Sequence, residues 1–299
     1  MNKFVEYNFI YNNKKYKTYQ NDLDYFEMTF YFDKLLKVEQ HTYKKLLIEY
    51  CKTIKNPGVM LSGGLDSMTL AHAFHEANNN ATQILYKIYD GGICLNEYES
   101  SFAEKFCKDY KQEMIIVKKD YDELIQEYLQ TDYWTPHPDL FLQFISVSKF
   151  GNNFTLQYGL PWPAHMKFRK NKLTLVQIYQ GINGETAFHK YAIPTGTSRA
   201  QTPTSSLGTA FLINDFIKNV TPDMGDFDHG WKYDYYTWLG FNLENHHKEY
   251  IMENRIIDRV EEFKKLKPNP NNWKKFISIP YDTFLEDYNN NTNVTYYSN

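Results

Sequence analysis

The sequence predicts an α/β protein whose core is a parallel β-sheet with helices on both faces, with an N-terminal β-hairpin and C-terminal helical additions. Two observations support this fold class. Between residues 42 and 150, short apolar runs alternate with segments whose apolar residues recur at helical spacing, which is the order of elements in βαβ units. The chain has 299 residues, of which 42% are hydrophobic, so it can fill a core of this size.

The N-terminal part of the chain is expected to be a short appendage. Aromatic and polar residues alternate on either side of Asn12-Asn13, a turn-prone pair, which predicts a β-hairpin within residues 1–40. A helix is then expected at residues 42–54, because Leu46, Leu47 and Tyr50 share one face and Asn56-Pro57-Gly58 stops it.

The predicted core spans residues 41–195 and alternates strands with helices. The expected strands are 59–61, 84–89, 114–117 and 173–179, and the expected helices are 68–77, 98–110, 121–129 and one from Pro138. Residues 196–288 are expected to be mostly helical and to complete the site, with helices near 208–219 and 248–266 separated by a Gly/Asp/Trp loop. The Asn-rich residues 289–299 are expected to form a flexible tail.

Composition excludes several classes of protein. The 33 Lys+Arg and 36 Asp+Glu residues give a net charge of -3, which provides no broad attraction to nucleic acid or to an anionic membrane. No apolar run is long enough for a membrane span or a secretory signal, so we expect a cytoplasmic protein. Cys51, Cys94 and Cys107 form no CxxC pair, which argues against a disulfide framework, a cysteine zinc site or a paired-thiol redox centre.

The turn between the first core strand and its helix reads Ser62-Gly63-Gly64-Leu65-Asp66-Ser67. Adjacent glycines are costly in regular structure, so the bare backbone must serve a purpose there. A parallel strand, a glycine turn and a helix N-terminus together direct backbone N–H groups at an anion. The spacing differs from GxxxxGK[ST], and no lysine follows. The alternative is an ordinary turn in which Asp66 or Ser67 caps the helix.

The SGGxDS pattern resembles the PP-loop of the ATP pyrophosphatase superfamily. This resemblance implies an adenine nucleotide α-hydrolase-like fold and a loop that holds the pyrophosphate part of ATP while a substrate atom attacks the α-phosphorus. Hydroxyl and amide groups of such a loop can bind phosphate oxygens, and Asp66 can hold Mg²⁺ against them. The implied nucleotide contacts are Leu61, Ser62, Gly63, Gly64, Leu65, Asp66, Ser67, Ile88, Asp90 and Gly181.

Two further segments resemble landmarks of asparagine synthetase: "NEYESSFAEKF" after the second strand and "GINGETAFHKY" after the fourth. The resemblance covers residues 42–191 and implies that Glu185 is the second carboxylate for Mg²⁺; the alternative is a solvated loop carboxylate. Ile182 stands where the family has an acidic residue implicated in handling the intermediate and ammonia. The second half-reaction must therefore differ unless Glu97 or another acid substitutes.

Other candidate residues are supported by weaker patterns. Glu97 and Tyr98 resemble the Tyr–Glu pair that acts on the amine in β-lactam synthetases, although a helix-start carboxylate followed by a core tyrosine would look the same. Asp90 ends the second strand, on the ligand side of an open sheet, but "DGG" is also an ordinary turn. Lys190, Arg199 and Lys232 are candidates to neutralise departing pyrophosphate; the alternative is three surface cations.

The expected activity is that of an ATP-dependent ligase. A substrate, most simply a carboxylate, is adenylylated with release of pyrophosphate, and an amine or ammonia then forms an amide. The expected cofactors are ATP and Mg²⁺. Because residue 2 is Asn and not the cysteine of a glutaminase, nitrogen is expected from an amine, free ammonia or a separate amidotransferase. Two alternatives remain: a PP-loop enzyme that modifies a nucleic-acid base or a deazapurine, and a non-catalytic ATP-binding protein.

Overall fold

The computed structural model of the chain describes the N-terminal strands, nearly all of residues 39–158, and parts of the remainder. The described residues are 5–17, 23–32, 39–131, 135, 138–158, 165–169, 172–178, 212, 214–216, 218–219, 230–244, 254–267 and 275–299. Among the helices in these ranges, none is long and apolar enough to cross a membrane.

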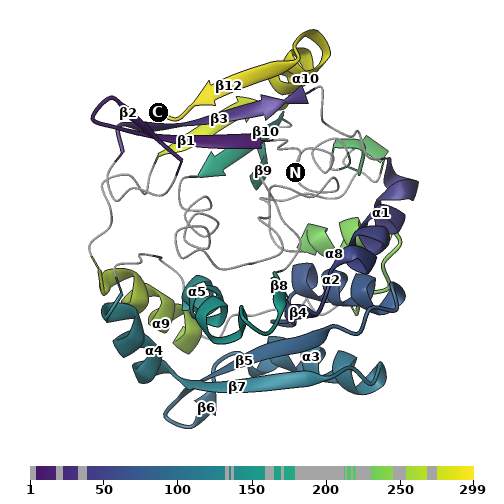
Figure 1. Cartoon of the computed structure of the whole chain (residues 1–299), viewed down its shortest axis with the longest axis vertical. Helices are drawn as coiled ribbons and strands as arrows, with labels where there is room; N and C mark the ends of the chain where they lie inside the picture. Colours follow the sequence, from purple (N-terminus) through teal and green to yellow (C-terminus); the bar gives the residue numbers. More distant parts are fainter. Residues whose placement is uncertain are drawn as a thin grey trace.

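A parallel sheet forms the centre of the α/β part of the molecule (Figure 1). Its strands are β4 (Pro57–Met60), β5 (Thr82–Asp90), β7 (Met114–Asp120) and β8 (Thr155–Gln157). β5 pairs in parallel with β4 and β7, and β4 pairs in parallel with β8. The short strand β6 (Ile93–Cys94) turns back onto the carboxyl end of β5. β5 is buried along almost its whole length, as expected for an inner strand of a parallel sheet.

Helices cover both faces of this sheet, which confirms the predicted fold class. Alternate residues of β5 point into two separate apolar clusters: Leu85 into the first, and Ile84 and Tyr86 into the second. The first cluster contains side chains of α1 (Gln40–Thr53), α2 (Leu65–Glu76) and α3 (Glu97–Asp109). The second contains side chains of α4 (Tyr121–Leu129), α5 (Pro138–Phe150) and α9 (Asn254–Lys265).

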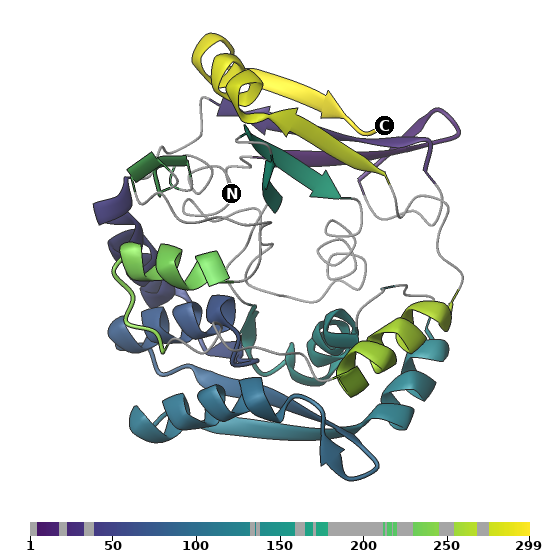
Figure 2. The same cartoon turned by 180° about the vertical axis from the view of Figure 1, so that it is seen from behind.

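The N- and C-terminal ends of the chain meet in an antiparallel sheet of order β12-β3-β1-β2, at the far end of the molecule from the parallel sheet (Figure 2). Its strands are β1 (Val5–Tyr11), β2 (Lys14–Tyr16), β3 (Tyr25–Tyr31) and β12 (Asn293–Tyr297). The predicted hairpin turn is confirmed: Asn12 and Asn13 have φ of 49° and 57°, which two-residue turns of this type require.

The expectation of a flexible C-terminal tail is wrong. Val294 pairs with Phe30 of β3, and the Ser298 hydroxyl accepts a buried hydrogen bond of 3.0 Å from the Phe26 N–H. Phe30 and Tyr296 pack edge to face with their ring centroids 5.6 Å apart. The hairpin is accordingly part of a larger sheet, because β3 joins it to the last strand of the chain. Polar composition misled the prediction, since only alternate residues of β12 face the apolar cluster.

A third sheet corrects the prediction for residues 173–179. β10 (Lys172–Ile178) is a strand, but it pairs antiparallel with β9 (His165–Arg169) and β11 (Phe276–Pro280). β8, which the sequence analysis missed, lies next to β4 in the parallel sheet instead. α10 (Tyr281–Asn290) follows β11, and its Phe284 packs edge to face against Phe30 with ring centroids 6.0 Å apart.

The part after residue 196 contains a helix that the sequence analysis placed in a loop. α8 (Gly230–Trp238) lies within the expected Gly/Asp/Trp loop, and it contacts α2. The predicted helix near 208–219 is confirmed at the described residues 212, 214–216 and 218–219. α9 lies within the range predicted for the long helix at 248–266.

Candidate functional site

The loop of residues 61–67 leaves the carboxyl end of β4 and enters α2. The Leu61 N–H still donates to Ile84 O at 2.9 Å, which holds the start of the loop against β5. The Ser67 hydroxyl donates to Gly64 O at 2.9 Å, and the Ser62 and Ser67 hydroxyl oxygens are 3.1 Å apart. The two serines of the motif are thus brought together on one side of the turn.

The structure explains why residue 63, the first of the two adjacent glycines, is glycine. Its φ is +94°, in the region that favours glycine, and a Cβ added there would lie 1.9 Å from Glu99 O, in the first turn of α3. The loop therefore rests directly on the backbone at the start of α3. A Cβ on Gly64 would meet only Ser62 Oγ at 3.5 Å, which is ordinary contact. Packing within the chain thus requires glycine at position 63 but not at position 64.

The N-terminus of α2 is available to an anion. Gly64 is the N-cap residue, with extended backbone, and no side chain caps the helix. The alternative in which Asp66 or Ser67 caps the helix is therefore wrong. Uncapped N–H groups and the helix dipole favour negative charge at this end. The structure thus places an uncapped helix N-terminus and two serine hydroxyls at the carboxyl edge of the parallel sheet, where ligands of open α/β sheets bind.

Asp66 is held by two residues of α8. Lys232 Nζ lies 2.8 Å from Asp66 Oδ2, and the Tyr236 hydroxyl donates to Asp66 Oδ1 at 2.5 Å. Tyr236 is buried, with 1% of its surface exposed, and its burial and the Asp66 carboxylate raise its pKa well above the usual value. Lys232 was one of the predicted cations; Tyr236 was missed.

A signal for this contact is present in the sequence. Lys232, Tyr236 and Leu239 have the i, i+4, i+7 spacing of one helix face, and Gly240 follows with a φ of +90°, a common helix stop. The i, i+4 spacing places Lys232 and Tyr236 side by side. The tryptophan and glycine content of the segment hid this periodicity.

Asp66, which the resemblance makes a metal ligand, is engaged by two side chains of α8 in this structure. Both carboxylate oxygens already have a partner, and among the residues that the structure describes, no group of three His, Cys, Asp or Glu could hold a metal ion. Glu185, the predicted second ligand, lies outside the described residues, as do Gly181, Lys190 and Arg199. Their roles stay predictions, and so does the Mg²⁺ site as a whole.

The basis for aligning the segment that contains Glu185 is nevertheless changed. That alignment took residues 173–179 as the fourth strand of the parallel sheet. β10 belongs instead to the antiparallel β9-β10-β11 sheet, so the strand that precedes this segment is not a strand of the parallel sheet.

Glu97 begins α3 and is paired with a buried lysine. Lys87 Nζ lies 3.2 Å from Glu97 and 2.8 Å from Glu104, and hydrogen bonds from the Cys94 thiol and from Lys87 lower the pKa of Glu97. Tyr98 is 45% exposed and packs edge to face on Phe102, so it is not the core residue considered as an alternative. The structure pairs Glu97 with Lys87. The backbone of Glu99, two residues further along α3, lies against Gly63.

Ile88 and Asp90, the nucleotide contacts predicted on β5, form hydrogen bonds or ion pairs with other residues of the chain. The Ile88 N–H donates to Asn96 Oδ1 at 3.0 Å, the Leu95 N–H donates to Ile88 O at 2.7 Å, and Asn96 Nδ2 donates to Tyr86 O at 2.8 Å. A ligand that binds the Ile88 backbone must displace these groups. Asp90 forms a two-point ion pair with Arg259 of α9, at 2.9 and 3.0 Å, so in this structure it attaches α9 to the end of β5.

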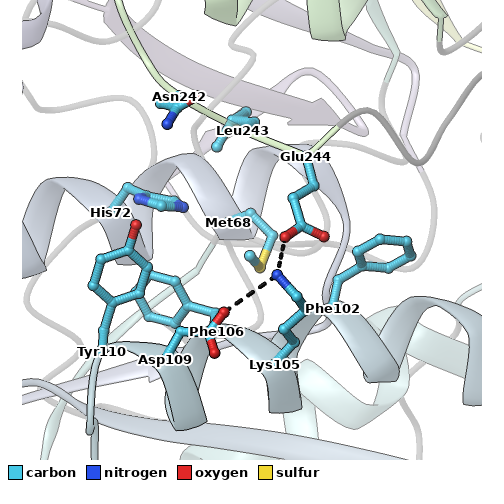
Figure 3. A pocket seen from close by; sticks show the side chains of 10 residues that line it. All are labelled: Met68, His72, Phe102, Lys105, Phe106, Asp109, Tyr110, Asn242, Leu243 and Glu244. Atoms are coloured by element: carbon cyan, nitrogen blue, oxygen red, sulfur yellow. Dashed lines mark hydrogen bonds and ion pairs between the residues drawn. The ribbon is translucent and has the colours of Figure 1, made fainter.

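A pocket of about 130 Å³ lies between α2, α3 and the segment that follows α8 (Figure 3). It contains none of the residues 61–67. Lys105 bridges Glu244 and Asp109 at its rim (Figure 3), and burial lowers the pKa of His72 to about 4. The candidate site is therefore defined by the loop and α8, and the pocket is a separate feature. The lining residues are Met68, His72, Phe102, Lys105, Phe106, Asp109, Tyr110, Asn242, Leu243 and Glu244.

Comparisons with known proteins identify no family. No family model matches the chain, and no curated protein matches it. Among solved structures, the chain is similar to an NH3-dependent NAD synthetase from Campylobacter jejuni subsp. jejuni in complex with the nitrate ion, with 16% identity and a TM-score of 0.32. The match covers 40% of this chain and 56% of that chain. The fold class and the site therefore rest on the geometry described above.

Proposed function

We propose that the protein is an ATP-dependent ligase that transfers AMP to a substrate, with a carboxylate as the favoured acceptor, and then forms an amide with an amine or ammonia. The observation that carries the proposal is the Ser62–Ser67 loop, which leads from a parallel strand into the uncapped N-terminus of α2 and faces the ammonium group of Lys232. Backbone N–H groups at a helix N-terminus, hydroxyl groups and an ammonium group together are suited to binding phosphate groups.

The groups available for the phosphates come from two distant parts of the chain. The loop supplies the Ser62 and Ser67 hydroxyls and the N–H groups at the start of α2. Lys232 adds a positive charge from α8, with a side chain that is 19% exposed, so the charge is only partly screened by water. A loop without its own lysine thus has a cation supplied by another helix.

The proposed chemistry has two steps. An acceptor carboxylate oxygen attacks the α-phosphorus of ATP, an O–P bond forms, and the bond between the α-phosphorus and the bridging oxygen breaks to release pyrophosphate. A neutral amine or ammonia then attacks the acyl carbon, the C–O bond to AMP breaks, and the nitrogen loses a proton. In the first step Ser62, Ser67 and Lys232 stabilise negative charge on the departing phosphates. No step is assigned to Mg²⁺, because Asp66 does not present a free carboxylate.

A second candidate function is a nucleotide-binding protein without ligase activity. The three predicted carboxylates that the structure describes each have a cation of the protein as partner: Asp66 with Lys232, Asp90 with Arg259, and Glu97 with Lys87. Such neutralised acids suit anion binding better than proton transfer. Such a protein would bind the phosphates of a nucleotide at the same loop but would not transfer AMP to an acceptor.

Isotope exchange distinguishes the two functions. Labelled pyrophosphate enters ATP only if an acyl adenylate forms reversibly, so we expect exchange that depends on one class of carboxylic acid in a panel of amino, dicarboxylic and hydroxy acids. The matched control is Ser62→Ala/Ser67→Ala, which removes both loop hydroxyls and should abolish exchange. Equilibrium binding of ATP without exchange for any acceptor would favour the non-catalytic protein, and release of ADP and phosphate as main products would contradict the ligase.

A further inference from the structure

Lys232 and Tyr236 together occupy the Asp66 carboxylate. Lys232 takes Oδ2 at 2.8 Å and Tyr236 takes Oδ1 at 2.5 Å. A Mg²⁺ or Mn²⁺ ion binds carboxylate oxygens directly, so it must compete with both groups. The ammonium group also carries the positive charge that a metal ion would supply.

We propose that Lys232 is the resident cation of this loop, and that it excludes a divalent metal ion from Asp66. An ammonium group at Asp66 Oδ2 repels a metal ion at the same carboxylate, so the pairing in the structure opposes the metal role implied by the resemblance. This inference concerns the carboxylate alone and does not require that the protein use ATP.

α8 is anchored so that Lys232 stays near Asp66. Gln40 Nε2 donates to Trp238 O at 2.5 Å, and Lys44 Nζ donates to Gly240 O at 2.9 Å, so α1 satisfies carbonyl groups at the end of α8. Tyr235 and Tyr236 are buried in the first apolar cluster. Because the helix cannot withdraw without exposing these side chains, the ammonium is fixed close to the loop rather than held only by its charge.

The Asp66–Lys232 pair is also more protected than a comparable pair on the same helix. The side chains of Lys232 and Asp66 are 19% and 29% exposed, whereas those of Lys44 and Glu76, at the other end of α2, are 28% and 37% exposed at a similar distance of 2.7 Å. Exposed ion pairs contribute little. Lys44 also donates to Gly240 O, so the control is Lys52, which pairs with Glu49 of α1 at 2.8 Å with side chains 49% and 55% exposed. Its removal changes the net charge equally and frees a carboxylate away from the loop.

The test measures Mn²⁺ binding to the full chain by electron paramagnetic resonance, with no nucleotide present. We expect wild type and Lys232→Arg to show only weak binding that Asp66→Asn does not change. Lys232→Met should gain an Asp66-dependent site that binds Mn²⁺ at least about a hundredfold more tightly than wild type does, as expected if the pair leaves the carboxylate available in no more than about one molecule in a hundred. The double variant Asp66→Asn/Lys232→Met should lose that site, and Lys52→Met should match wild type. Circular dichroism establishes that each variant is folded.

Two results would overturn the inference. One is Mn²⁺ binding by wild type that Asp66→Asn abolishes, because the carboxylate would then be open to metal. The other is Mn²⁺ binding by folded Lys232→Met equal to that of wild type, because lysine would then not be what excludes the ion. If the inference holds while ATP fails to bind, only the proposed function is lost.

Discussion

Lys232 and Asp66 are 166 residues apart in the sequence, and Lys232 Nζ lies 2.8 Å from Asp66 Oδ2. The contact joins α8 to the turn between β4 and α2, and Tyr236 reinforces it from the next turn of α8. It determines what the loop presents to a ligand: a paired carboxylate, an ammonium group, and an uncapped helix N-terminus.

Gly63→Ala should destabilise the protein by at least about 2 kcal/mol, because the residue has positive φ and its Cβ would lie 1.9 Å from Glu99 O. Gly64→Ala is the matched control, with a cost of about 1 kcal/mol or less, since its Cβ meets only Ser62 Oγ at 3.5 Å. Urea denaturation measures both. Equal losses for the two variants would show that the loop does not rest on α3 as described.

Tyr236→Phe should lower the free energy of unfolding by roughly 1.5–3 kcal/mol, because it removes a hydrogen bond to a charged acceptor from a buried position. The comparison is Tyr50→Phe, which loses a hydrogen bond of 3.1 Å to the neutral Gln157 side chain and should cost about 1 kcal/mol. Thermal and urea unfolding report both values. A smaller loss at Tyr236 than at Tyr50 would argue against the contact with Asp66.

Acid should weaken the fold through His72. Burial lowers its pKa from 6.5 to about 4, and the carboxylates of Glu76 and Glu244 oppose this effect without outweighing it. Between these pH values the unfolded chain binds a proton that the folded chain does not, so the free energy of unfolding falls as the pH falls. This contribution, up to about 3 kcal/mol, is fully present above pH 6.5 and is lost towards pH 4.

The check is urea denaturation at several pH values from 7 to 4.5. His72→Gln should flatten the pH dependence, whereas His41→Gln, at an exposed position on α1, should retain the wild-type slope. If the slopes of wild type and His72→Gln coincide, His72 is not the group responsible.

Arg259→Met should cost about 3 kcal/mol, because it leaves the carboxylate of Asp90, which is 8% exposed, without its two-point partner. Asp90→Asn/Arg259→Met should recover at least about 1 kcal/mol of this loss, since no buried charge remains. Lys264→Met, which breaks an exposed pair on the same helix, should cost less than about 0.5 kcal/mol. Additive effects of the Asp90 and Arg259 substitutions would mean that the two residues do not interact.

Local patterns allowed much of the fold to be predicted. The helices of the α/β part follow from apolar spacing, the hairpin from Asn12-Asn13, and the central strand β5 from its apolar run. What could not be predicted depends on long-range pairing. β12 pairs with β3, and β10 pairs with β11 and β9, and neither partner can be read from a single segment.

In the candidate site, too, the local motif could be predicted and the long-range contacts could not. Ser62, Gly63, Gly64 and Ser67 were recognisable because a strand, a glycine turn and a helix lie together in the sequence. Asp66, Asp90 and Glu97 instead form ion pairs with residues that only folding brings near them. Local sequence cannot show that a carboxylate is already neutralised by a lysine or arginine from another element.

A crystal structure of the protein with a non-hydrolysable ATP analogue tests the central claim most directly. The account predicts that the phosphate oxygens lie within hydrogen-bond distance of the N–H groups of residues 63–67 and of the Ser62 and Ser67 hydroxyls, with the ammonium of Lys232 beside them. A saturating analogue bound elsewhere, such as in the pocket between α2 and α3, with the loop free of phosphate, would contradict it.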